Sequence, residues 1–477
     1  MRALVLLHRW LGIGVCALFA MWFASGIAML FVAFPSLTET ERVAGLGEID
    51  APRVRHAVGE AVTASGIADT RRVRLVQRAD GPVYVVTGLS RLAAVRADDL
   101  SDARVTSTEA ARELAPGHAH RGAIKTAGIT SQGIASHDQW TVPNGYDPHR
   151  PLYRIALNDP AGTELYVSSI TGEIVQDTTR HERAWNYFGS VVHWIYPTIL
   201  RSHWVAWDRT VWTLSLVALI AAMTGVTLGI LRLRKTPTGL RTPFRGWHAW
   251  HHGLGLISAT FVVTWIFSGW LSMDHGRLFS SGQMSDAERA TLTPPLDMGR
   301  LTMAERPMLA GARELEWFGL GGQIYRRDRT GVDSQVISSP GSNNHVSGQA
   351  RSFLTASDIA IAVMRIAPDC AAPIVVLADD SYPATSSIPS APIYRSVCGD
   401  VWFHIDGANG AVVERLDSSR RAYRWAFNGL HKFDVPLFVD HPTPRRVMVV
   451  SLCLLGFVFS VTGVVVGWRR LRERFHP

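Results

Sequence analysis

The sequence is poor in cysteine, and its four cysteines form neither a CxxC nor a CxxCH motif. This absence excludes a thioredoxin-type redox site and the covalent attachment of a c-type haem. The chain has no GxSxG or HExxH motif, which argues against a hydrolase. It has no GxGxxG motif either, so nothing in the sequence indicates a bound flavin or nicotinamide cofactor.

Charge is also scarce, and it is almost missing from four long apolar runs. Charged residues make up 18% of the chain and hydrophobic residues 47%. The runs cover 10–34, 211–231, 254–273 and 447–468, and each has roughly the 20 residues that a helix needs to cross a bilayer. The first run is too long for the apolar part of a signal peptide and lacks a convincing cleavage site, so it predicts an uncleaved anchor.

The positive charge that is present predicts an orientation in the membrane. The net charge is +8, and basic residues cluster before the first run, between the second and third, and after the fourth. These residues are Arg2, Arg9, Arg232, Arg234, Lys235, Arg241, Arg245, Arg469, Arg470, Arg472 and Arg474. By the positive-inside rule these sites are cytoplasmic, which places both long connections, about 36–205 and 275–442, in the periplasm of a bacterium. Topology therefore explains much of the charge, and we expect no nucleic-acid partner.

The second half of the chain repeats the first. A shift of 238 residues aligns Gly172 with Gly410, Arg183 with Arg421, His193 with His431, His203 with His441, Thr224-Gly225-Val226 with Thr462-Gly463-Val464, and Gly229 with Gly467. A shift of 243 aligns His8 with His251, Leu11-Gly12 with Leu254-Gly255, Trp22 with Trp265, and Ser25-Gly26 with Ser268-Gly269. Because both halves have the same orientation, the repeat predicts a pseudo-twofold axis along the membrane normal.

The predicted fold class is an α-helical membrane protein whose four transmembrane helices form a tandem pseudo-twofold duplication with two periplasmic α+β domains. The predicted parts are transmembrane helix 1 (1–35), periplasmic domain 1 (36–180), an amphipathic or re-entrant segment (181–207), helix 2 (208–234), a cytoplasmic loop (235–246), helix 3 (247–274), periplasmic domain 2 (275–418), a second amphipathic or re-entrant segment (419–443), helix 4 (444–470) and a cytoplasmic tail (471–477). Both termini are expected in the cytoplasm.

Within the periplasmic domains, capping residues and apolar alternation predict helices over 53–65, 106–114 and 355–366 and strands over 73–77, 83–87, 152–157, 164–168 and 401–405. Residues 116–151 are rich in Gly, His, Asn and Pro and predict a loop. Cys370 and Cys398 share the second domain, where the oxidising compartment allows a disulfide.

The two connecting segments differ in polarity. Residues 184–200 are apolar enough to dip into the membrane, with Pro197 ending their helix, whereas Lys432 and Asp434 favour an interfacial position for 423–438.

Matched histidines beside the membrane helices suggest haem ligands, because ionisable residues there are costly and generally have a function. A b-type haem takes two axial imidazoles from facing elements, and bis-histidine ligation, which leaves no open position, suits electron transfer. The matched pairs are His8 with His251 on the cytoplasmic side, and His193 with His431 and His203 with His441 on the outer side. We expect two b-type haems and leave open which outer pair binds one.

Two alternatives accompany this interpretation. A histidine at a helix start is often only an interfacial anchor or a cap. His248 and His252 lie four residues apart on one helical face, so either could take the place of His251.

The chain resembles a known family in several places. The helix over 106–114, the following hairpin and the turn at Thr171-Gly172-Glu173 resemble a PepSY domain. The HRWLG sequence that starts at His8, the histidine-containing segment before the second membrane helix and the TGV motif at Thr224 resemble the PepSY-associated transmembrane family. That family includes iron-regulated membrane proteins and ferric-siderophore reductases, some of which carry two b-type haems.

The resemblance implies an oxidoreductase of the inner membrane that reduces a periplasmic ferric complex, such as a ferric siderophore, for iron uptake. The cytoplasmic parts are too short for a nucleotide-binding fold, so electrons would come from a membrane quinol or a separate reductase. Two alternatives are a non-enzymatic PepSY sensor or binding protein, and a siderophore or metal transporter without redox chemistry.

Overall fold

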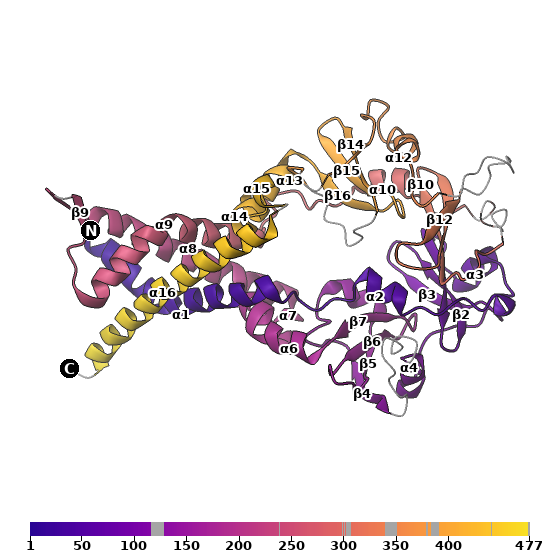
Figure 1. Ribbon diagram of the computed structural model, residues 1–477, viewed down its shortest axis with the longest axis horizontal. Helices are drawn as coiled ribbons and strands as arrows, with labels where there is room; N and C mark the ends of the chain where they lie inside the picture. Colours follow the sequence, from indigo (N-terminus) through magenta and orange to yellow (C-terminus); the bar gives the residue numbers. More distant parts are fainter. Residues whose placement is uncertain are drawn as a thin grey trace.

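The computed structural model describes residues 1–475 apart from 116–127, 238, 298, 300, 302–306, 339–350, 378–379, 383–390 and 440. Long helices form a bundle that carries both chain termini at one end, and β-sheets gather at the other end (Figure 1). We call these the terminal end and the sheet end of the bundle.

The bundle contains α1 (Arg2–Phe31), α8 (Trp204–Arg232), α9 (Gly246–Ser272) and α16 (Pro442–Phe475). All four are long and apolar enough to cross a membrane, which confirms the four predicted helices. They pack in a ring, with α1 and α9 each contacting both α8 and α16. Helix α16 extends through most of the predicted tail 471–477, of which 476–477 lie outside the described residues.

The predicted loop 235–246 contains a short hairpin of β8 (Arg234–Thr236) and β9 (Gly239–Arg241) at the terminal end.

The central sheet has six strands and draws on both halves of the chain. Its antiparallel order is β12-β11-β10-β1-β2-β3. The strands are β1 (Arg72–Arg78), β2 (Gly81–Thr87), β3 (Leu92–Arg96), β10 (Glu314–Leu320), β11 (Gln323–Arg329) and β12 (Gln335–Ser338). The halves meet where β1 pairs with β10, with Val73 opposite Trp317. The predicted domains 36–180 and 275–418 therefore share a sheet, which local sequence patterns did not indicate.

The two faces of this sheet differ because side chains alternate along a strand. One face packs Leu75, Leu315 and Trp317 into an apolar core with α3 (Val58–Ser65). The other face carries charges on β1, β10 and β11. Four of them are buried, namely Glu314, Glu316, Arg327 and Arg329, and two are partly buried, namely Arg72 and Arg74. Helix α2 (Glu39–Ala44), beginning just after α1, brings further partners to this charged face.

The charges on this face form ion pairs of opposite sign with one another and with neighbouring segments. Arg42 Nη1 lies 2.5 Å from Glu314 Oε2, and Arg74 Nη1 lies 2.6 Å from Glu173 Oε1. Burial by itself would raise the pKa of Glu314, but the charges of Arg42 and Arg74 outweigh burial and hold that pKa well below its usual range. This network joins the N-terminal half to the C-terminal half.

Two smaller sheets have the same strand order and each packs against one helix. The first is β4-β5-β6-β7 with α4 (Thr108–Leu114), and the second is β13-β14-β15-β16 with α12 (Ala356–Val363). The strands are β4 (Thr130–Ala135), β5 (Leu152–Ala156), β6 (Glu164–Ser168), β7 (Ile174–Thr178), β13 (Ile374–Val375), β14 (Ile393–Cys398), β15 (Val401–Asp406) and β16 (Val412–Leu416). These units confirm the predicted hairpin of 152–168 and fit PepSY-like α+β domains.

The predicted loop 116–151 is wrong in part. It contains β4 and a 3₁₀ helix, η3 (Asn144–His149), while 116–127 lie outside the described residues. Strand β4 is an exposed edge strand with the sequence TSQGIA, so it lacks the apolar alternation by which a strand is predicted.

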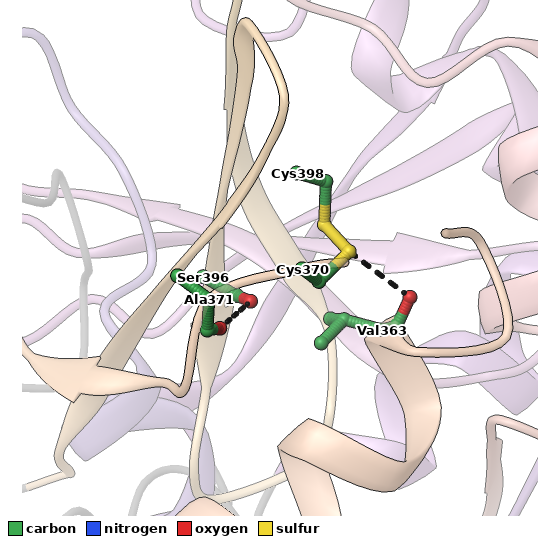
Figure 2. The surroundings of a disulfide bond; sticks show 5 residues. All are labelled: Val363, Cys370, Ala371, Ser396 and Cys398. Carbon is green, nitrogen blue, oxygen red and sulfur yellow. Dashed lines mark hydrogen bonds between the residues drawn. A yellow bond between two sulfur atoms is a disulfide. The ribbon is translucent and has the colours of Figure 1, made fainter. Parts of the chain in front are cut away.

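Cys370 and Cys398 form a disulfide. It ties the loop after α12 to the end of β14, and Cys370 Sγ lies 3.3 Å from the carbonyl oxygen of Val363 (Figure 2). Beside it, the hydroxyl of Ser396 donates to the carbonyl oxygen of Ala371 at 2.9 Å. The loop is thus held to the sheet by both covalent and hydrogen bonds.

The connections to the bundle are broken helices. The first has α6 (Arg180–Asn186), the π-helical turn η4 (Tyr187–Val191) and α7 (Thr198–Arg201). The second has α13 (Ser418–Tyr423), the π-helical turn η5 (Arg424–Gly429), α14 (Leu430–Lys432) and α15 (Pro436–Val439). Pro197 precedes α7 as its N-cap, after the earlier helical turns have ended. Two further short helices among the described residues are η1 (Ala51–Arg53) and α10 (Asp286–Leu292).

Replacing Glu314 by Gln is expected to lower the free energy of unfolding by about 3–5 kcal/mol, because Arg42 would lose its buried carboxylate partner and keep only Glu39. Chemical denaturation of the detergent-purified chain measures this. Glu60→Gln, at a side chain 55% exposed, is the control and should change stability by less than about 0.5 kcal/mol. Equal effects of both changes would contradict a structural role for the charged face.

Replacing Cys370 by Ser is expected to lower stability by roughly 2–4 kcal/mol, because the disulfide closes a loop over a separation of 28 residues. In the wild-type chain, thiol labelling after denaturation should modify Cys16 and Cys453 alone until a reductant is added. Labelling of all four cysteines without reductant would contradict the bond.

Candidate haem-binding site

Two pairs of histidines meet inside the bundle, one near each end. His8 of α1 faces His251 of α9 with ring centroids 6.4 Å apart, and we call these the terminal-end pair. His193, two residues after η4, faces His431 of α14 with ring centroids 6.4 Å apart, and we call these the sheet-end pair. Each pair takes one residue from each half of the chain, as the sequence alignment of the halves predicts.

Each imidazole of the sheet-end pair is held by a serine through Nδ1. His193 Nδ1 lies 3.0 Å from Ser25 Oγ, and the Ser25 hydroxyl donates to the carbonyl oxygen of Met21 at 2.7 Å. His431 Nδ1 lies 3.1 Å from Ser268 Oγ and 3.2 Å from the carbonyl oxygen of Trp265. The carbonyl can only accept, and the Ser25 hydroxyl hydrogen is already used, so Nδ1 carries the proton in both rings.

The terminal-end pair is held in the same way. His8 Nδ1 lies 3.1 Å from the carbonyl oxygen of Ala221, which can only accept. His251 Nδ1 lies 3.1 Å from Thr462 Oγ1, whose hydroxyl donates to the carbonyl oxygen of Phe459. With Nδ1 protonated, Nε2 carries the lone pair, which is the nitrogen a metal would bind.

A glycine lies against each of the four rings. A Cβ placed on Gly225 would come 2.7 Å from His8 Cε1, and one on Gly463 would come 3.4 Å from His251 Cε1. At the sheet end, the corresponding distances are 3.6 Å from Gly26 to His193 Cε1 and 3.4 Å from Gly269 to His431 Cε1. Any side chain at Gly225 would therefore displace the His8 ring.

The four contacts share one sequence pattern, a hydroxyl residue followed by glycine. The dipeptides are Ser25-Gly26, Ser268-Gly269, Thr224-Gly225 and Thr462-Gly463. We call each of them a cradle. The alignment of the two halves contains all four dipeptides, but only the structure shows that each contacts a histidine.

The pairs lie at two depths of the bundle. His8 and Ser25 are 17 residues apart on α1, which corresponds to roughly 26 Å along a helix axis. His193 therefore lies beside α1 more than one helical turn before that helix ends at Phe31. His431 lies beside α9 in the same way, so the two connecting segments pack alike despite their different polarity.

The pairs fit a haem better than a bare metal ion. Among the described residues, no group of three or more His, Cys, Asp or Glu side chains could hold a metal ion. A haem needs only two protein ligands because the macrocycle supplies the other four. Two metal–nitrogen bonds of about 2 Å, with about 1 Å from each nitrogen to its ring centre, bring the centroids about 6 Å apart, close to the observed spacing.

Arg424, at the start of η5, is a further candidate contact for a haem. It is 5% exposed. Its Nη1 donates to the carbonyl oxygen of Asp434 at 2.6 Å and its Nη2 lies 3.6 Å from Asp434 Oδ1, whereas its Nε has no hydrogen-bond partner among the described residues. Arginine is the residue best suited to bind a carboxylate, and haem carries two.

The other candidate histidines do not face one another in this way. His203 caps the start of α8 and His441 precedes α16, and both side chains are exposed. His248 is exposed, whereas His252 is buried and its Nε2 lies 2.9 Å from the carbonyl oxygen of Gly229. The ring that faces His8 is thus His251 rather than either neighbour.

A family model described as the PepSY-associated TM region matches residues 5–470. No curated protein matches the chain.

Gly225→Ala tests the terminal-end cradle, because the added methyl group would meet His8 Cε1 at 2.7 Å. We expect the purified variant to lose about half of its bound haem relative to the wild type, with the sheet-end pair retained. Gly14→Ala on α1 is the control, since a Cβ there has nothing within 4 Å. Equal haem content in the two variants would contradict the cradle.

Proposed function

Because the chain belongs to the PepSY-associated transmembrane family, we propose that it is a haem b-containing electron-transfer protein of the bacterial inner membrane that reduces a periplasmic ferric complex. The observation that carries this proposal is the geometry of the histidines. Four imidazoles are fixed as the Nδ1 tautomer and meet in two pairs 6.4 Å apart.

The orientation follows from charge. The terminal end of the bundle carries Arg2, the basic hairpin β8–β9 and the arginines near the end of α16. The positive-inside rule places this end in the cytoplasm and the sheets in the periplasm. A tandem duplication with a pseudo-twofold axis along the bundle explains why each pair has one histidine from each half.

Two b-type haems bound by these pairs would supply one-electron carriers at both depths of the membrane. The chain's own residues fix the position and the basicity of the ligands. Each Nδ1–H donates to a hydroxyl or carbonyl oxygen, which orients the ring and makes Nε2 a stronger ligand. Apolar side chains around the pairs, among them Phe23 and Trp265, exclude water from the bundle core.

The ferric complex is the substrate, and a ferric siderophore is the substrate class that we propose. Each ferric ion takes up one electron, and the chelator then binds the resulting ferrous ion much less tightly, so iron is released for import. Two histidines on each haem would leave no open coordination position, so electron transfer to the complex would be outer-sphere and would need no acid–base residue. The electron donor is a membrane quinol or a separate reductase.

A non-enzymatic sensor or binding protein would also use the two PepSY-like sheets. Such a protein has no need for oriented imidazole pairs inside the bundle, which are costly within a membrane. The paired histidines therefore favour electron transfer.

The absorption spectrum of the purified chain tests the proposal. We expect a Soret band and, after dithionite, the α band of a b-type haem, with two haems per chain and reoxidation by a ferric siderophore. His8→Ala and His193→Ala should each lose about one haem, and His203→Ala, at an exposed side chain outside the pairs, should keep both. Protein without haem after haem-replete expression, or unchanged haem in the first two variants, would overturn it.

A further inference from the structure

An apolar groove opens on the surface of the bundle at its sheet end. It lies between α1 and α16 beside α6 and encloses about 620 Å³. Its walls include Ala24 and Ala28 of α1 and Leu454 and Phe457 of α16, with Trp185 of α6 at its rim. His181, at the start of α6 and exposed, is the one titratable side chain among its lining residues. The volume is that of a small-molecule site.

The side chains that the first half contributes to this groove differ from those at the aligned positions of the second half. A shift of 243 residues aligns Ala24 with Phe267 and Ala28 with Leu271, so large side chains of α9 stand where α1 has alanines. The shift of 238 aligns His181 with Ser419, which removes the titratable group as well. A general need for helix packing or lipid contact would apply to both halves. The small residues and the histidine of one half therefore indicate a specific occupant.

The groove lies directly beside the sheet-end pair. Ala24 precedes Ser25 and Gly26, the cradle of His193, on α1. Cys453 precedes the lining residue Leu454, and its Sγ lies 3.9 Å from a Cβ placed on Gly26. The lining of the groove and the cradle of His193 are thus formed by neighbouring residues of α1.

We propose that this groove binds a membrane quinol as the electron donor, with its tail along α1 and α16 and a ring hydroxyl on His181. This inference rests on the proposed electron-transfer function and names the donor. A quinol is apolar enough to reach a groove that opens toward lipid, and its ring hydroxyl matches the one titratable side chain there. A lipid acyl chain would contact the apolar walls, but it could neither form a hydrogen bond with His181 nor donate electrons to the adjacent histidine pair.

The electrons and protons balance with two ferric complexes. The quinol loses two electrons and two protons and becomes a quinone. One electron reduces each of two ferric ions to ferrous ions, and both protons pass to water on the periplasmic side, the first through the imidazole of His181. His8 and His251 of the terminal-end pair would hold a second haem, which would supply a site for the second electron until a second ferric complex arrives.

Photoaffinity labelling of the full-length chain in nanodiscs tests binding without relying on turnover. The probe is a short-chain azidoquinone, and we expect labelled peptides from 24–32 or 181–188. Ala24→Phe, which installs the residue that α9 has at the aligned position, should reduce labelling at least about tenfold. Ile257→Phe, at an α9 side chain 69% exposed, is the control and should label like the wild type.

The rate of haem reduction by decylubiquinol or a short-chain menaquinol completes the test. Ala24→Phe should slow it at least about tenfold while dithionite still reduces both haems, and His181→Gln should slow it as well. Labelling elsewhere, or labelling displaced equally by phospholipid, would overturn the quinol site. So would an Ala24→Phe variant as fast as Ile257→Phe. Protein that carries no haem but still labels at the groove would contradict the proposed function and not this site.

Discussion

The hydrogen bond from Nδ1 of each paired histidine is the interaction on which the site depends. A neutral imidazole can rotate and can carry its proton on either nitrogen, so an unheld ring would not present a fixed lone pair. Ser25 and the carbonyl oxygens of Ala221 and Trp265 remove this freedom. The cradle glycines then allow the rings to lie against the neighbouring helices. Ligand position and protonation are thereby built into helix–helix contacts rather than into flexible loops.

The connecting segments and the shared sheet hold the histidines in position against the bundle helices. The π-helical turns η4 and η5 lie just before His193 and His431, and a π turn widens the helix locally and shifts the residues that follow. Outside the bundle, the shared six-stranded sheet joins the two halves through β1 and β10. Its charged face adds ion pairs between residues far apart in the chain, such as Arg42 and Glu314. The two histidines of a pair come from different halves, so an interface that holds the halves together also supports each pair.

The sequence predicted the parts of this structure that depend on local patterns. Four apolar runs predicted the four bundle helices. The alternation of apolar and polar residues, together with turn residues, predicted the hairpin of 152–168. The sequence repeat predicted the pairs His8 with His251 and His193 with His431, and the structure brings the two rings of each pair together. The repeat could not decide between His251 and His252 as the ring that faces His8. Successive side chains on a helix point about 100° apart, and only the packing of the helices determines which ring turns inward. The shared sheet was missed because pairing between β1 and β10 depends on strand edges far apart in the chain. The cradles were present as repeated dipeptides, yet contact between them and the rings is a tertiary property.

The central claim is that each pair provides two imidazole ligands to one haem iron. Electron paramagnetic resonance of the oxidised, purified chain tests it most directly, because the spin state reports the axial ligands. The account predicts low-spin ferric signals from two haems per chain, both typical of bis-histidine ligation. A high-spin signal, which would mean an open axial position, or the absence of any haem signal would contradict it.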